Sequence, residues 1–137
     1  MEVPTFIRNH QALFDFFGYW PSFHDADVLA CTGPSAERQT VDLTLHTWEM
    51  TSEVDAKGYF VLQKHVLVTF HFCDVHDATL ERFGLDNILF GMNITRDGDA
   101  SSFHVGLDSV MDKSGSFAAR SGEIVSVVPC TSEGKAI

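Results

Sequence analysis

The amino-acid sequence predicts an α+β fold in which a mainly antiparallel β-sheet packs against one N-terminal amphipathic helix. Three observations lead to this fold class. A stretch near the start repeats apolar residues with a helical period, the chain after Phe23 alternates apolar and polar residues as strands do, and glycine-containing turns separate short strands with no second long helix. At 137 residues the chain has the length of one domain, and we expect residues 1–137 to form a single one.

The predicted helix covers about residues 6–17 and packs on one face of the sheet. Five residues recur at the spacing of one helix face: Phe6, His10, Leu13, Phe14 and Phe17. Thr5 is placed to cap the N-terminal end, and Gly18 is placed to end the helix. The sequence therefore predicts one short amphipathic helix that precedes all of the strands.

Strands are predicted from about residue 26 to residue 128. In the run 40–48, Val41, Leu43 and Leu45 alternate with Asp42, Thr44 and His46, which predicts a strand with a buried side and a solvent-facing side that includes His46. The run 66–73 is apolar on both sides and is expected in the middle of the sheet. The remaining expectations are strands at 26–31, 78–80, 88–94, 103–107 and 124–128, a helical turn at 85–89, and a frayed polar tail at 131–137.

The charge balance narrows the classes of partner. Asp and Glu total 19 against 9 Lys and Arg, a formal net charge of −10. Nucleic acid and anionic membranes are therefore not expected as partners. Basic proteins are the natural complement, although an acidic surface also serves solubility alone. Both explanations of the negative charge, a basic protein partner and solubility, stay open.

Signal, membrane-span and cysteine patterns in the sequence indicate where the protein is located. Glu2, Pro4 and Arg8 do not fit the basic start and apolar middle of a secretory signal, and no run approaches the roughly 18 apolar residues of a membrane span. The three cysteines are widely spaced and odd in number, as is typical of thiols in a reducing compartment. We expect a cytoplasmic protein without a cofactor.

The strongest enzyme alternative is a metal site in the segment 71–77. Histidine, cysteine and aspartate side chains cluster there: His71, Cys73, Asp74, His76 and Asp77. His71 and Cys73 would project from the same side of a strand, so two zinc ligands could converge, with His46 or His24 as a further ligand. No motif of metal-ligand spacing supports the site, and no phosphate-binding or nucleophile motif occurs, so we expect no catalytic or metal-binding residue.

The most distinctive run of the sequence joins the helix to the first strand, and we call residues 18–28 the corner. Its letters are GYWPSFHDADV. In one interpretation Trp20 and Phe23 fold back to pack the helix against the sheet, while Asp25 pairs with His24 or caps the turn. In the other, Tyr19, Trp20, His24 and Asp27 stay partly exposed and anchor a partner.

The corner resembles the G-x-W-P-x-F-H-D-A-E-V signature of the immunity protein 50 family of bacterial polymorphic toxin systems. The resemblance continues more weakly through 45–49, 68–70 and 87–89, and this sequence departs from the signature at Asp27, where the family more often has glutamate. It implies a small, mainly β cytoplasmic protein that binds and neutralises a toxin made by the same cell and performs no catalysis. The remaining alternative is a structural or oligomerisation domain.

A basic toxin, such as a nuclease, would meet an acidic protein quickly because opposite charges raise the association rate. Six residues are candidates for an acidic surface that would contact it: Asp42, Glu49, Glu53, Asp55, Asp97 and Asp99. Each of them, taken alone, is also an ordinary solvated charge. The sequence does not determine the oligomeric state.

Overall fold

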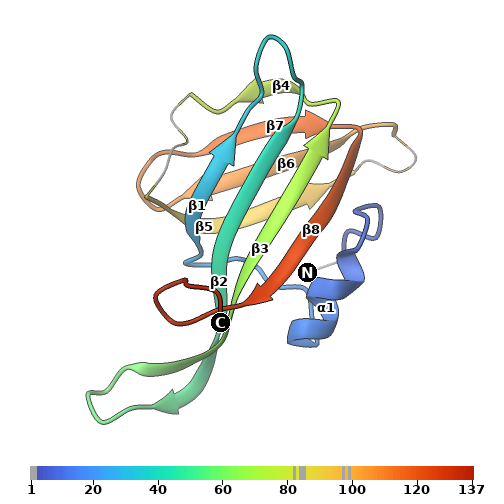
Figure 1. Ribbon diagram of the computed structural model, residues 1–137. Coiled ribbons are helices and arrows are strands. Elements are labelled where there is room, and N and C mark those ends of the chain that lie inside the picture. Colours follow the sequence, from blue (N-terminus) through green and yellow to red (C-terminus); the bar gives the residue numbers. More distant parts are fainter. Residues whose placement is uncertain (1–2, 82, 84–85, 97, 99) are drawn as a thin grey trace.

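The computed structural model describes residues 3–81, 83, 86–96, 98 and 100–137 (Figure 1). Within these residues it has one helix and eight strands: α1 (His10–Phe17), β1 (Asp27–Thr32), β2 (Val41–Val54), β3 (Phe60–Cys73), β4 (His76–Thr79), β5 (Asn87–Thr95), β6 (Phe103–Ser109), β7 (Gly115–Ala119) and β8 (Ser121–Pro129). The fold class is α+β with a mainly antiparallel sheet, as predicted. Among the described residues, the helix is too short and too polar to cross a membrane.

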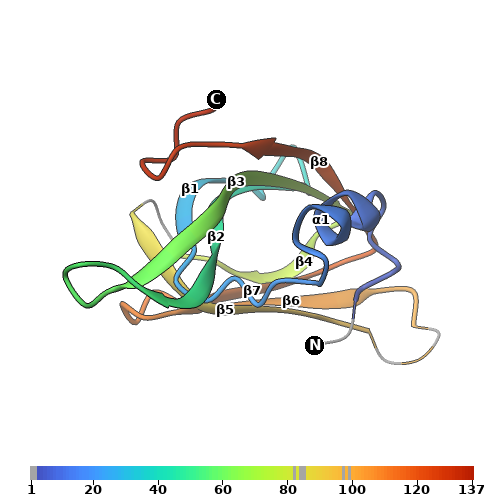
Figure 2. The ribbon, with the colours of Figure 1, turned by 90° about the horizontal axis from the view of Figure 1, so that it is seen from below.

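The eight strands form one sheet that folds over itself. Their order is β4-β7-β6-β5-β1-β2-β3-β8, and every neighbouring pair is antiparallel. The two halves are joined by the short pairing of β1 with β5 through Asp27 and Val28, and in Figure 2 the half with β2, β3 and β8 lies over the half with β5, β6 and β7. The buried core fills the space between them, with Leu45 and Phe70 from one half and Leu107 and Phe117 from the other.

The helix begins at His10, so the predicted start at residue 6 is wrong. Arg8 pairs with β8 instead, because its backbone N–H donates to Gly122 at 2.9 Å and its carbonyl accepts from Ile124 at 2.9 Å. The expected Thr5 cap is also wrong: Asn9 precedes the helix, and its side chain donates to the Ile124 carbonyl at 3.0 Å. The predicted end is confirmed, since Gly18 has φ 85° and donates to Phe14.

The N-terminal segment closes the open side between the two halves of the sheet (Figure 2). Helix α1 contacts β8, and Leu13 and Phe17 enter the core. The ring of Phe6 lies 5.1 Å from the ring of Phe103 on β6, which ties the segment to the other half. The segment therefore covers core side chains that an open sheet would leave in water.

The predicted alternation of β2 is confirmed except at His46. Val41, Leu43 and Leu45 are fully buried, whereas His46, expected on the solvent-facing side, is only 3% exposed. His46 is buried because the C-terminal segment covers it. This segment is not the frayed tail that the sequence predicts. Thr131 donates to Lys135 and Ile137 donates to Pro129, so the segment forms a hairpin that covers His46.

The other strands show where alternation is a reliable signal. β3 lies between β2 and β8, as its two apolar sides predict. β7 was not predicted, because Phe117 is its one large apolar residue. The helical turn expected at 85–89 is wrong for its described part: Asn87 begins β5, and the Leu89 N–H donates to Ala26.

Candidate functional site

The corner divides its aromatic residues between the core and the surface. Trp20 and Phe23 are 6% and 2% exposed, their ring centroids lie 6.2 Å apart, and the Phe23 ring meets Phe70 of β3 at 5.9 Å. Both therefore pack the corner against the sheet, and Trp20 is not an exposed anchor. Tyr19 and His24 are exposed, so the corner also presents polar groups to solvent.

The backbone of the corner holds His24 and Asp25 outward. Phe23 has φ 62°, which is unusual for a bulky residue and costs about 1–3 kcal/mol. Asp25 has φ 67°, and its N–H donates to Leu89 of β5 at 2.8 Å. The predicted pairing is present: His24 Nδ1 lies 3.2 Å from Asp25 Oδ2. Burial of the Phe23 ring thus fixes an exposed His–Asp pair in place.

A cavity of about 160 Å³ lies between the corner and the segment 47–50 of β2, and we call it the corner cavity. Carboxylates and aromatic rings share its lining, including Asp25, Glu49, Tyr19 and Trp48. The structure thereby brings together two predicted groups of residues, because Tyr19, His24 and Asp25 come from the corner and Glu49 comes from the predicted acidic surface. Trp48 was not predicted to belong to the site.

Glu49 is held by hydrogen bonds to both of its carboxylate oxygens. The Tyr19 hydroxyl donates to Oε2 at 2.6 Å, and Gln63 Nε2 donates to Oε1 at 2.5 Å. These bonds lower the pKa of Glu49, while burial and the bond to Glu49 raise the pKa of Tyr19 to about 12. Near neutral pH, the site therefore holds an oriented, ionised carboxylate beside a neutral phenol.

Asp27 is not among the residues that line the corner cavity. It pairs with His46 across β1 and β2, and its Oδ2 lies 3.6 Å from His46 Nδ1. His46 Nε2 lies 3.0 Å from His65 Nδ1, and the Trp48 ring lies 4.9 Å from the His46 ring. Asp27 thus contacts the buried His46, whose burial the sequence did not predict because the C-terminal hairpin that covers it is remote in the chain.

Burial and the neighbouring His65 lower the pKa of His46 below its ordinary value of 6.5. Because unfolded chains bind a proton at this residue more readily than folded ones, the free energy of unfolding should fall as pH drops below about 6.5. Urea unfolding at pH 7.5 and at pH 5.5 measures this loss. In the variant His46→Gln the loss should be smaller, and an unchanged loss would assign the pH dependence to other groups.

Beyond residue 49, strands β2 and β3 continue as a hairpin that projects from the sheet (Figure 1), and we call residues 50–62 the arm. Its apolar side chains are exposed: Met50, Val54, Tyr59, Phe60 and Leu62. Met50 is opposite Leu62 and Val54 is opposite Phe60, and directly paired residues point to the same side of a sheet, so these four form one apolar face.

The arm also carries two residues of the predicted acidic surface. Glu53 is exposed, as expected. Asp55 instead stabilises the turn at the tip, where its Oδ1 accepts the backbone N–H groups of Lys57 at 2.8 Å and Tyr59 at 3.0 Å. The apolar face was not predicted from the sequence, although Met50, Val54, Phe60 and Leu62 are apolar residues among polar ones.

Of the other predicted acidic residues, the structure describes Asp42 alone. Asp42 lies near the opposite end of β2, where its Oδ1 is 2.6 Å from His71 Nδ1. Asp97 and Asp99 lie outside the described residues. Among its described members, Glu49, Glu53 and Asp55 lie in or beside the arm and Asp42 does not, so these four residues do not form one patch.

The side chains of the segment 71–77 do not converge as the enzyme alternative requires. His71 is occupied by Asp42, and His76 Nδ1 contacts the backbone carbonyl of Asp74. Across the part of the chain that the structure describes, no group of three or more His, Cys, Asp or Glu side chains is arranged to hold a metal ion. Burial also raises the pKa of Cys31 to about 11 and raises that of Cys130, which leaves both thiols protonated and poor nucleophiles.

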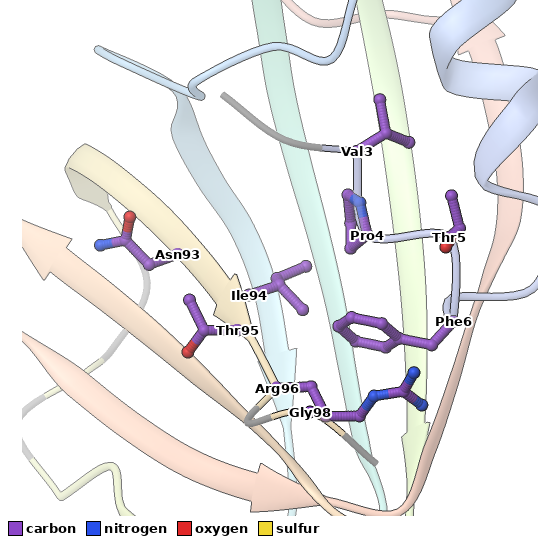
Figure 3. Close-up of a pocket in the computed structure, with 9 residues that line it drawn as sticks. All are labelled: Val3, Pro4, Thr5, Phe6, Asn93, Ile94, Thr95, Arg96 and Gly98. Atoms are coloured by element: carbon purple, nitrogen blue, oxygen red, sulfur yellow. The ribbon is translucent and has the colours of Figure 1, made fainter. Parts of the chain in front are cut away.

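A second cavity, of about 440 Å³, lies between the N-terminal segment 3–6 and the end of β5 (Figure 3). Arg96 is the one ionisable residue among the described residues that line it, and its guanidinium carbon lies 4.7 Å from the centroid of the Phe6 ring. None of the predicted site residues that the structure describes lines this cavity. The corner cavity and the arm together are therefore the candidate site.

Comparison with protein-family models, curated proteins and solved structures finds no match for the chain.

Proposed function

We propose that this chain is a non-catalytic immunity protein, which binds a basic toxin made in the same cell and neutralises it by covering its active surface. The observation that carries the proposal is the arm, whose exposed apolar face stands beside the corner cavity. The resemblance of residues 18–28 to the immunity protein 50 family agrees with it.

The arm has the properties of a protein-binding element. Tyr59 is 69% exposed and Phe60 is 55% exposed, which is unusual for large apolar side chains paired on one hairpin. Contiguous exposed apolar groups mark interaction surfaces, and aromatic side chains contribute the largest binding energies in such surfaces. Because the hairpin projects from the sheet (Figure 1), it can enter a concave site on a partner.

The negative net charge of the chain favours a basic partner. At −10, the chain repels a second copy of itself and attracts a basic polypeptide. Glu49, whose pKa is lowered, keeps its negative charge next to the arm. A partner that combines a basic surface with an apolar groove therefore fits this side of the molecule, and a nuclease toxin has the required charge.

The salt dependence of association tests the electrostatic part of this proposal. We expect the association rate with the toxin encoded beside this chain's gene to fall by at least about tenfold between low salt and roughly 0.5 M salt, because screening removes the attraction. Stopped-flow mixing at several salt concentrations measures the rate. A rate that does not change with salt would remove charge from the mechanism.

A further inference from the structure

We propose that the corner cavity receives an arginine side chain of the partner. This inference rests on the proposed function, because it assigns to a basic protein partner the group that enters this cavity. It is carried by the size of the cavity and by the aromatic Tyr19 and the carboxylates of Asp25 and Glu49 among its lining residues.

Size restricts the occupant. A volume of about 160 Å³ is smaller than the roughly 300–1,000 Å³ of sites for drug-sized ligands. It equals about five waters at roughly 30 Å³ each, which is room for the end of one long side chain. The cavity is therefore suited to a single residue of a partner and not to a free cofactor.

The walls favour a flat cation. Tyr19 contributes aromatic surface and is exposed rather than buried in the core, while the Trp48 ring packs against His46 and His65. Guanidinium groups stack on aromatic rings and are more weakly hydrated than ammonium groups, so they lose less on leaving water. Among natural side chains, arginine alone combines this planar cation with a long apolar stem.

The carboxylates supply the matching charge. Each oxygen of Glu49 accepts one hydrogen bond, from Tyr19 and from Gln63, and an ionised carboxylate offers about four acceptor positions in total. Two positions thus remain for a bidentate guanidinium, which has the donor geometry for them. Asp25, fixed by the corner backbone and paired with His24, adds a second negative charge on the other side of the cavity.

The Lys64 ammonium and the His24 imidazole are near the cavity, and other groups already contact both of them. The Lys64 ammonium donates to the Phe17 carbonyl at 3.5 Å, and its charge contributes to the lowered pKa of Glu49. His24 Nδ1 faces Asp25, while the His24 ring packs against Phe90 at 5.3 Å. Neither side chain is among the hydrogen-bond donors to Glu49.

Butylguanidinium is the probe that tests this inference without any partner protein. Titrated into the purified chain, it should cause saturable shifts in the amide NMR signals of Tyr19, Asp25 and Trp48, whereas the neutral isostere butylurea should cause none. Glu49→Gln should weaken the binding about tenfold, since a hydrogen bond to a charged group is lost. The matched control Glu37→Gln, an exposed residue between β1 and β2 that does not line the cavity, should leave it unchanged.

Any one of three results would overturn the inference. These are shifts that do not saturate with butylguanidinium, equal shifts with butylurea, or an affinity of the Glu49→Gln variant equal to that of the natural chain. Asp25→Asn serves as a second variant, because asparagine tolerates the positive φ at this position and removes the charge. Different results would contradict the inference about the cavity and the proposed immunity function. Butylguanidinium binding without a toxin partner would reject only the function, and toxin binding unaffected by Glu49→Gln would reject only the cavity.

Discussion

Replacing Trp20 with alanine should lower the free energy of unfolding by about 3–5 kcal/mol. The indole is 6% exposed, packs edge-to-face on Phe23 and belongs to the core, so its loss leaves a cavity between the corner and the sheet. Small domains are stable by only about 5–15 kcal/mol, so the variant would lose roughly a fifth or more of its stability. Urea unfolding followed by circular dichroism measures the change.

Tyr59→Ala is the matched control for Trp20→Ala, because it truncates an aromatic ring that is 69% exposed. Its effect on the free energy of unfolding should stay within about 0.5 kcal/mol. Equal losses in the two variants would contradict the placement of Trp20 in the core. A Trp20→Ala variant that keeps its stability but loses the toxin would instead make Trp20 a binding residue.

Replacing Phe60 with alanine should weaken toxin binding by about thirtyfold or more. Large aromatic side chains at the centre of an interface contribute about 2 kcal/mol or more, and each 1.4 kcal/mol changes the affinity tenfold. Phe60 is 55% exposed in the free protein, so the free energy of unfolding should change little. Calorimetric titration of the toxin with each variant measures the affinity.

Two valines provide a control matched in residue type. Val54 lies on the apolar face of the arm and is 58% exposed, while Val125 lies on β8 and is 55% exposed. Val54→Ala should reduce toxin affinity, and Val125→Ala should leave it unchanged. Equal effects of these two substitutions, or a Phe60→Ala variant that binds as tightly as the natural chain, would show that the arm does not contact the toxin.

The sequence predicts those parts of the fold that depend on local pattern. Period-two alternation located the buried side of β2, and Gly18 located the end of the helix. The errors arise from contacts between distant segments. Arg8 leaves the helix because it pairs with β8, and His46 is buried because the C-terminal hairpin covers it. Neither contact leaves a periodic signal in the sequence.

The candidate site was predicted in part. The distinctive letters of the corner predicted a wider group: Tyr19, Trp20, Phe23, His24, Asp25 and Asp27. Of these, Trp20 and Asp27 do not line the cavity, and Glu49 was predicted separately as a member of the acidic surface. The assembly of the lining residues into one cavity depends on the pairing of β2 with β3, including an irregularity between Thr47 and Glu49 that places Glu49 opposite Gln63. Sequence pattern does not fix such a register shift, so the partnership of Tyr19 with a residue 30 positions away emerged only from the structure.

Protection of cells tests the central claim most directly. The proposed toxin, sought among the products of neighbouring genes, is expressed in a sensitive host, alone or together with the chain, and surviving colonies are counted. We expect co-expression to restore growth, the two proteins to purify as a complex, and Phe60→Ala to reduce protection. Growth arrest that persists with abundant, folded chain present would contradict neutralisation by binding.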